Sequence, residues 1–158
     1  MHTPKMLGVC MRYTNNKDAA EDMLQEGFIK VFTKIDAYSG EGSFAGWVHR
    51  IFVTTALESL RQQNVLKFAV NIEDYKESFE SINDSAIDNI SNEDLMACIS
   101  KLSEGYRTVF NLYAIEGYSH AEIALELQIT EGTSRSQFAR ARKILQESIQ
   151  SLYGRFKK

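Results

Sequence analysis

The chain has 158 residues, of which 44% are hydrophobic and 25% charged, and its formal net charge is −3. This composition is typical of a soluble globular protein with one compact or two small domains, and the mild negative charge argues against a protein that coats nucleic acid by bulk attraction. No apolar run is long enough to cross a membrane, and no charged-then-apolar leader indicates secretion. Cys10 and Cys98 are isolated from each other and from any histidine pair, so we expect buried thiols in a reducing compartment and no metal site.

The N-terminal part, residues 1–64, has helical periodicity. An apolar stripe predicts a buried helix face made of Ala20, Leu24, Phe28, Val31, Phe32 and Ile35. The opposite face is polar and holds Glu21, Asp22, Gln25, Glu26 and Lys30. A turn-rich loop follows at 38–42, and Ser43 is the expected N-cap of a third helix that reaches Leu60. That helix is apolar over much of its circumference, so we expect it at the centre of a bundle, with a polar side formed by His49, Arg50, Thr54, Thr55, Glu58 and Arg61.

Residues 65–92 show no strong hydrophobic period, and Ser, Asn, Asp and Glu dominate. The charged residues from Glu73 to Asp94 are acidic except for Lys76, so we predict an acidic linker. Helices are expected again at 92–102 and at 104–116, the second with Val109, Phe110, Leu112 and Tyr113 buried. The predicted fold is therefore all-α, with two small helical domains (1–64 and 93–158) joined by the linker 65–92.

The stretch from Gly117 to Lys143 has the pattern of a helix-turn-helix. Ser119 and Glu122 form a capping box at the start of the first helix, and Thr130 is the expected N-cap of the second. In the second helix we expect Phe138, Ala141, Ile144 and Leu145 to face inward, and Arg135, Ser136, Gln137, Arg140 and Lys143 to stay outside. Arginine suits guanine edges and phosphates, and glutamine suits adenine edges, so this helix could lie in the major groove of DNA. The alternative is an amphipathic helix with an ordinary solvated basic face.

No catalytic constellation stands out in the sequence. It has no Gly-rich phosphate loop, no nucleophile paired with a base, and no pair of carboxylates with a predicted pocket. We therefore expect no enzyme activity and no cofactor.

Three blocks in order carry a family resemblance: residues 18–32, residues 42–51, and residues 102–110 together with the helix-turn-helix. They resemble region two, the promoter-melting segment and region four of bacterial sigma factors of the sigma-70 superfamily, in the short extracytoplasmic-function (ECF) group. The blocks cover nearly the whole chain outside the linker. The resemblance implies a cytoplasmic promoter-specificity subunit that guides core RNA polymerase to promoters and melts them. The alternative is a free-standing helix-turn-helix regulator with a helical dimerisation or sensor domain.

The resemblance also implies partners and contact residues. In the first block Asp22, Gln25 and Glu26 would meet the clamp helices of the polymerase, although a solvated acidic face is the favoured explanation without the family context. Region four would meet the polymerase flap. The acidic linker would thread toward the active-site cleft, and a cognate anti-sigma factor would be a further partner.

The minus-ten element would be bound by the second block and the loop before it, where aromatic stacking contributes about 1–3 kcal/mol per base. The implied residues are Tyr38, Ser39, Ser43, Phe44 and Trp47, with Arg50 and Arg61 on backbone phosphates and Thr54 near the melted strand. For Trp47, packing in the core is the favoured alternative. Many relatives have Asn at Thr54 and Asp at Glu58. The usual leading part of the first helix is short or missing before Pro4, which would fit a trimmed or misassigned start.

The minus-thirty-five element would be bound by the recognition helix. Arg135, Ser136, Gln137 and Arg140 are the implied base and phosphate contacts, and Arg142 and Lys143 the flanking phosphate contacts. Gln128 stands where the turn of such a motif often has Gly. If this position requires a positive φ, Gln costs about 1 kcal/mol there.

Overall fold

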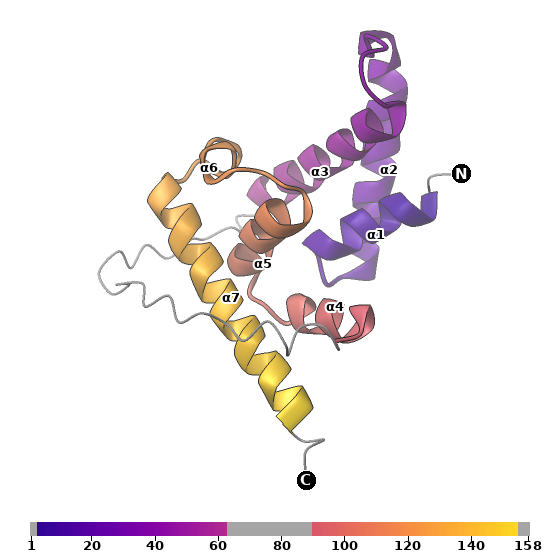
Figure 1. Cartoon of the computed structure of the whole chain (residues 1–158). Coiled ribbons are helices and arrows are strands. Elements are labelled where there is room, and N and C mark those ends of the chain that lie inside the picture. Colours follow the sequence, from indigo (N-terminus) through magenta and orange to yellow (C-terminus); the bar gives the residue numbers. More distant parts are fainter. Residues whose placement is uncertain (1–2, 63–89, 155–158) are drawn as a thin grey trace. The chain divides into compact units, whose positions relative to one another are not determined.

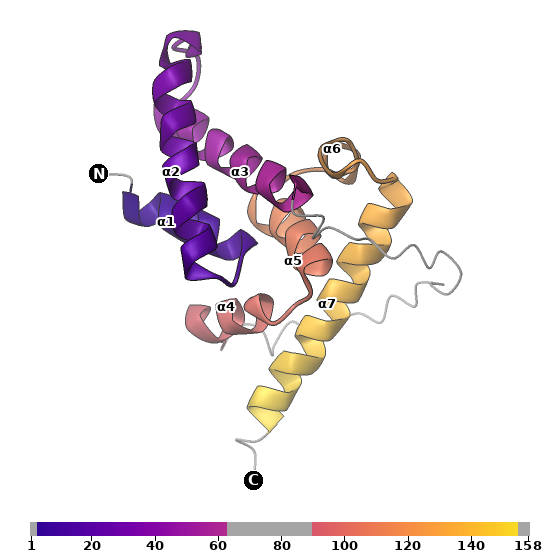
Figure 2. The same ribbon diagram turned by 180° about the vertical axis from the view of Figure 1, so that it is seen from behind.

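A computed structural model describes residues 3–62 and 90–154 of the chain, shown from two sides in Figures 1 and 2. Every regular element among these residues is a helical one, which confirms the all-α prediction. The chain divides into two compact units, Met1–Lys67 and Phe68–Lys158. Residues 65–89 of the predicted acidic linker lie outside the described residues, so the linker stays a prediction.

Unit 1 is a bundle of three helices, α1 (Thr3–Tyr13), α2 (Lys17–Lys34) and α3 (Phe44–Gln62), with a short 3₁₀ turn, η1 (Ile35–Ala37), after α2. The Asn16 side chain starts α2 by accepting hydrogen bonds from the amides of Asp18 (2.9 Å) and Ala19 (3.2 Å). All three helices pack on one another. The core includes Met6, Val9, Cys10, Tyr13, Ala20, Met23, Val31, Val48, Phe52, Val53, Ala56, Leu57 and Leu60. Seven of the 19 residues of α3 are buried, and α3 packs on both other helices, as its apolar circumference predicted.

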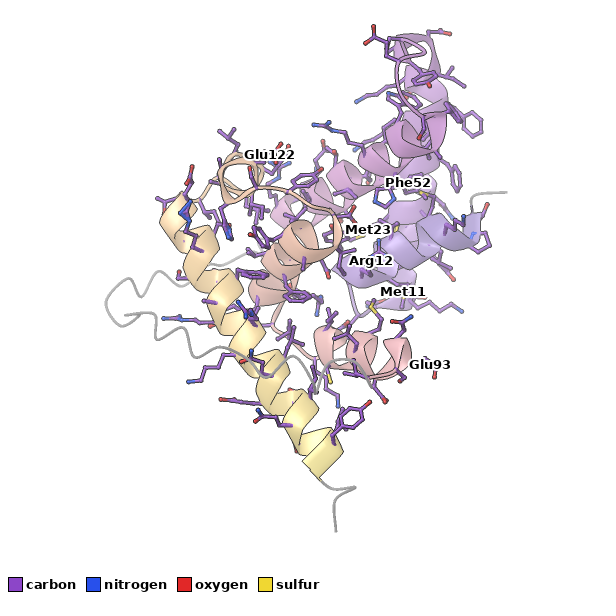
Figure 3. All side chains as sticks on the ribbon, in the orientation of Figure 1. Met11, Arg12, Met23, Phe52, Glu93 and Glu122 are labelled. Carbon is purple, nitrogen blue, oxygen red and sulfur yellow. The ribbon has the colours of Figure 1, made fainter. Side chains whose placement is uncertain are left out.

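The helices α2 and α3 approach each other closely at Gly27. Phe52, labelled in Figure 3, is fully buried, and a Cβ atom at Gly27 would overlap its ring. Phe28 packs edge-on against the same ring, with centroids 5.1 Å apart. A side chain at position 27 would therefore have to push the two helices apart.

Unit 2 is built on one long helix, α7 (Glu131–Gly154), against which α4 (Asn92–Ser100), α5 (Glu104–Phe110) and α6 (His120–Leu127) all pack. Ser91 caps α4 by accepting a hydrogen bond from the Asp94 amide. After α5 the chain makes a π-helical turn, η3 (Asn111–Ile115). One cluster of its core joins Cys98, Ile99 and Leu102 to Ala141 and Leu145 of α7.

Arg107 occupies the interior of this unit, with 2% of the residue exposed. Its Nη1 donates to the carbonyls of Ser100 (3.3 Å) and Leu102 (3.1 Å), where α4 has just ended. Burial lowers the pKa of Arg107, and the carboxylate of Glu104 opposes that effect. The guanidinium thus supplies donors to carbonyls that the end of α4 leaves without helical partners.

Several expected burial positions are wrong. Phe32 and Ile35, placed in the buried stripe of α2, are 71% and 45% exposed, since α1 covers only the earlier part of α2 (Figures 1 and 2). Thr55, expected on the polar side of α3, is buried, because it lies on the side of α3 that packs into the bundle and its hydroxyl is satisfied by the Ile51 carbonyl (2.8 Å). Tyr113 is 40% exposed, since the π-helical turn rotates the side chains that follow it relative to an α-helix.

We predict that Gly27→Ala destabilises unit 1 by roughly 1–3 kcal/mol, because the added methyl overlaps Phe52. Urea unfolding followed by fluorescence of Trp47, the single tryptophan, measures the change in unit 1. The matched control is Gly8→Ala in α1, where a Cβ meets nothing within 4 Å and alanine should stabilise by up to about 1 kcal/mol. Equal midpoints for Gly27→Ala and wild type would show that the close approach is not a constraint.

Candidate nucleic-acid and polymerase interfaces

The helix-turn-helix has the caps that the sequence predicted. The Ser119 Oγ accepts from the Glu122 amide (3.1 Å), and the Glu122 carboxylate accepts from the Ser119 amide (2.8 Å). Figure 3 labels Glu122 on α6. Thr130 accepts a hydrogen bond from the Thr133 amide (3.0 Å) and so begins α7. Both helix starts are therefore fixed by local hydrogen bonds.

The turn between these helices passes through a left-handed residue. Gln128 has φ 57° and ψ 43°, and it is the non-glycine residue with positive φ among those described. Its amide and that of Ile129 both bond to the Ala124 carbonyl, which closes α6. The position does have a positive φ, which is the condition under which Gln was expected to cost about 1 kcal/mol.

The exposed side of α7 differs from the predicted one at two positions. Arg135, Arg142 and Lys143 are exposed, while Ser136 and Arg140 are half-buried. Gln137, expected outside, is only 6% exposed, and Ile144, expected inside, is 39% exposed. The buried stripe instead runs through Thr133, Ser134, Gln137, Ala141 and Leu145. Its first part is polar, and for that reason a search for apolar residues missed it.

One polar contact explains how α7 is oriented against α6. The Ser134 side chain is fully buried, and its Oγ lies 2.8 Å from Nδ1 of His120. The His120 ring stacks on Tyr113 at a centroid distance of 4.3 Å and touches Phe138 edge-on at 5.9 Å. Burial lowers the pKa of His120, and the nearby Arg135 adds to this effect. The ring is therefore held neutral at pH 7, and this cluster was not visible in the scattered histidines of the sequence.

The arginine nearest the start of α7 is already paired. Arg135 Nη2 lies 3.0 Å from the Glu131 carboxylate, one turn earlier, and both side chains are about half exposed. An exposed pair of this kind contributes little to stability. Arg135 can therefore exchange Glu131 for a phosphate or a guanine edge.

The loop before α3 gathers the aromatic residues expected near the minus-ten element. The Tyr38 ring lies 5.4 Å from Phe44 and 5.4 Å from Trp47, and Phe44 lies 5.7 Å from Trp47. The Tyr38 hydroxyl donates to the Gly42 carbonyl (2.8 Å), and both Gly40 and Gly42 have positive φ. Ser39 accepts from the Glu41 amide and Ser43 from the Gly46 amide, as expected for a turn and an N-cap. Phe44 is 40% exposed and Trp47 half-buried, so the three rings form an aromatic cluster at the surface.

A cavity of about 260 Å³ opens between α2 and α3, with Trp47 in its wall. We call it the α2–α3 pocket; it is lined by Lys30, Lys34, Ala37, Trp47, Arg50, Ile51, Thr54, Thr55 and Glu58. It unites the predicted residues Trp47, Arg50 and Thr54, but Arg61 does not line it. Lys30 and Lys34 also line this pocket, although neither was predicted from the sequence to belong to a binding site. Neither Lys34 nor Arg50 makes an ion pair with any residue that the structure describes, so two cations face this pocket unneutralised.

The exposed face of α2 combines charge with large apolar groups. Asp22, Gln25 and Glu26 are exposed, as predicted. Ile29 (62% exposed) and Phe32 (71% exposed) follow at helical spacing and extend the same face. We call these five residues the α2 face. Exposed apolar side chains next to one another are a feature of protein-binding surfaces, and the sequence analysis had placed Phe32 in the core.

Within the described part of the chain, no group of three or more His, Cys, Asp or Glu residues could hold a metal ion. None of the described helices is long and apolar enough to cross a membrane.

One unit thus carries a helix-turn-helix, and the other carries an aromatic cluster beside a pocket that contains cations. Residues 1–65 match the family described as Sigma-70 region 2, and residues 92–145 match Sigma-70, region 4. The chain is 31% identical to the RNA polymerase sigma-H factor of Pseudomonas aeruginosa, over 94% of this chain and 82% of that protein. It is 32% identical to the ECF RNA polymerase sigma-E factor of Escherichia coli K12, over 96% and 84% of the two chains.

A third relative is longer. The ECF RNA polymerase sigma factor SigE of Mycolicibacterium smegmatis is 33% identical over 94% of this chain, and the match spans 58% of its own length. Among solved structures, the sigma factor RpoE of Bartonella quintana, in complex with the anti-sigma factor NepR, has the same fold, with a TM-score of 0.57, 22% identity, and coverage of 94% and 91% of the two chains. The chain therefore belongs to the sigma-70 family, in its ECF group, and is a sigma factor of transcription initiation.

We predict that Gln128→Gly stabilises unit 2 by about 1 kcal/mol, because glycine adopts the left-handed conformation without the clash of a Cβ atom. Urea unfolding followed by far-ultraviolet circular dichroism measures the change. Gln128→Ala is the matched control, since alanine keeps the Cβ atom and should give no gain. Equal gains from both substitutions would contradict this account of the turn.

Proposed function

We propose that this sigma factor brings core RNA polymerase to promoters by three surfaces of its own. The α2 face docks on the polymerase clamp helices, the α2–α3 pocket and its aromatic cluster hold the melted minus-ten strand, and the exposed side of α7 reads the minus-thirty-five element. The chain itself catalyses no reaction and acts in the cytoplasm, where the polymerase works. The observation that carries this proposal is the α2–α3 pocket, since it joins a ring for stacking to cations for phosphates.

The pocket fits a nucleotide of a single strand by its chemistry. A base can stack on an aromatic ring, which contributes about 1–3 kcal/mol per base. Lys34 and Arg50, which lack an internal carboxylate partner among the described residues, can bind the phosphates that flank such a base. Tyr38 and Phe44 extend the stacking surface beyond Trp47. Arg61 lies outside this pocket, so its proposed role is limited to a more distant phosphate.

The α2 face fits a protein partner better than a nucleic acid. Its carboxylates would repel phosphates, whereas they can pair with basic side chains on a partner helix. Ile29 and Phe32 supply apolar area that a partner would remove from water, which is the usual source of binding energy at such interfaces. The same exposed apolar residues would also suit a cognate anti-sigma factor, which would compete with the polymerase for them. Region four would in turn bind the polymerase flap.

The burial of Gln137 reduces the set of α7 side chains that we propose to contact DNA. Arg135 and Arg140 are the proposed base or phosphate contacts, with Ser136 beside them and Arg142 and Lys143 on flanking phosphates. Gln137 could reach DNA only if the packing around it changed, because 6% of it is exposed. We therefore propose that it supports the helix and does not read bases.

We predict that Ile29→Ala with Phe32→Ala weakens binding to core polymerase about tenfold, because both side chains would be buried in that interface. Stability should stay unchanged, since both already contact water. Titration of labelled protein with core polymerase measures the affinity. Met11→Ala is the control, because Met11 is also a large exposed residue of unit 1 (39%; Figure 3) but lies on α1. Unchanged affinity of the double variant would rule out this docking face.

The test of the whole proposal is transcription with core polymerase and a library of random promoters. Initiation should occur at a common minus-ten and minus-thirty-five sequence only when the chain is present. Arg135→Ala and Arg140→Ala should each cost about 1–3 kcal/mol at the upstream element if they contact bases, and should change the selected sequence there. No initiation, with tight sequence-specific binding by the chain alone, would instead indicate a free-standing regulator.

A further inference from the structure

Lys30 holds two carboxylates at once. Its Nζ lies 3.0 Å from Glu26, one turn earlier on α2, and 2.5 Å from Glu58 on α3. The Lys30 side chain is 23% exposed, whereas the two carboxylates are about half exposed. Partial burial lowers the pKa of Lys30, but the hydrogen bonds that its ammonium group donates to Glu58 and Glu26 outweigh that effect, and the pKa is raised. Lys30 therefore stays charged across the physiological pH range.

The two carboxylates belong to different surfaces. Glu26 is part of the α2 face, which is proposed to dock on the polymerase, and it does not line the α2–α3 pocket. Glu58 lines that pocket, and so does Lys30 itself. A single ammonium group thus connects the proposed protein-binding surface to the proposed strand-binding pocket.

Because Lys30 pairs with both Glu26 and Glu58, a ligand that binds at one of the two surfaces changes the electrostatics of the other. A basic side chain of a partner that pairs with Glu26 competes with Lys30 for that carboxylate. Lys30 then neutralises Glu58 more completely, and the pocket, which also contains Lys34 and Arg50, becomes more attractive to a phosphate. The converse also holds, since a phosphate that draws Lys30 into the pocket leaves Glu26 more available to a basic partner.

We propose that Lys30 is a positioning residue that couples polymerase docking on the α2 face to the binding of a single strand in the α2–α3 pocket. The inference rests on the proposed function of these two surfaces. It predicts that part of the mutual strengthening between polymerase and DNA passes through this one side chain. Because the pairs are partly exposed, the share should be modest, about two- to fivefold.

The experiment measures the affinity of the full chain for core polymerase with and without saturating single-stranded DNA of the selected minus-ten sequence. The ratio of the two affinities is the coupling factor. In Lys30→Met this factor should fall about two- to fivefold relative to wild type. Lys30→Arg, which keeps a cation within reach of both carboxylates, should restore it. Lys17→Met is the control, since Lys17 is also on α2 and, among the described residues, pairs with Glu21 at 3.8 Å and with neither Glu26 nor Glu58; it should leave the factor unchanged.

Glu58→Gln provides a second measurement that does not depend on the folding of Lys30→Met. This substitution removes the carboxylate that pairs with Lys30 in the pocket and leaves the Lys30–Glu26 pair intact. It should therefore also lower the coupling factor. The inference is overturned if Lys30→Met and Glu58→Gln keep the wild-type factor, or if Lys30→Arg loses as much as Lys30→Met. If wild type itself binds neither polymerase nor DNA, the proposed function fails as well. If wild type binds both and the factor is insensitive to Lys30, only this inference fails.

Discussion

The close contact of α2 with α3 at Gly27 and Phe52 determines the geometry of unit 1. Because position 27 has no side chain, the two helices approach until the Phe52 ring fills the space between them. This approach brings Lys30, one turn after Gly27, within hydrogen-bond distance of Glu58 on α3. It also leaves the α2–α3 pocket open one turn further along, where Lys34 and Arg50 face it. A bulkier residue at 27 would therefore alter the pocket and the ion pairs together.

Unit 2 depends on a comparable contact of polar residues. The recognition helix α7 needs an exposed basic side and a buried side, and its first two turns have few apolar residues to bury. The contact of Ser134 with His120, the stacking of Tyr113 on His120 and the tilted packing of Tyr113 against Phe138 replace the missing apolar contacts. Further along α7, Ala141 and Leu145 pack on α4 and the turn that follows it in the ordinary way. The first part of the helix is thus oriented by one hydrogen bond and three rings, and that contact determines which side of α7 the arginines occupy.

The features that were predicted correctly from the sequence are those that local interactions determine. The caps at Ser43, Ser119 and Thr130, the left-handed turn at Gln128 and the start of α4 at Asn92 each depend on residues within a few positions, and all agree with the structure. The predicted burial of a side chain was wrong where its exposure depends on an element distant in the sequence. Gln137 is buried because it lies on the stripe of α7 that packs into unit 2, and Phe32 is exposed because α1 covers only the earlier part of α2. The α2–α3 pocket joins residues from two helices about twenty positions apart, so no local pattern could reveal Lys30 and Lys34 as part of it.

The cations of the two proposed DNA surfaces differ in whether they have an internal carboxylate partner, and this difference affects the cost of binding DNA at each surface. Arg135 of α7 has an internal partner, Glu131, so a phosphate or base must replace an existing ion pair. Lys34 and Arg50 have none among the described residues, so a phosphate in the pocket replaces only water. Under the proposed function, binding at α7 would therefore cost an ion pair, whereas binding at the pocket would not. If polymerase fixes both units on one promoter, the second contact would form at high effective concentration, so that two weak sites would act as one strong and specific one. Two surfaces that are weak when separate would leave the choice of promoter to the complete polymerase.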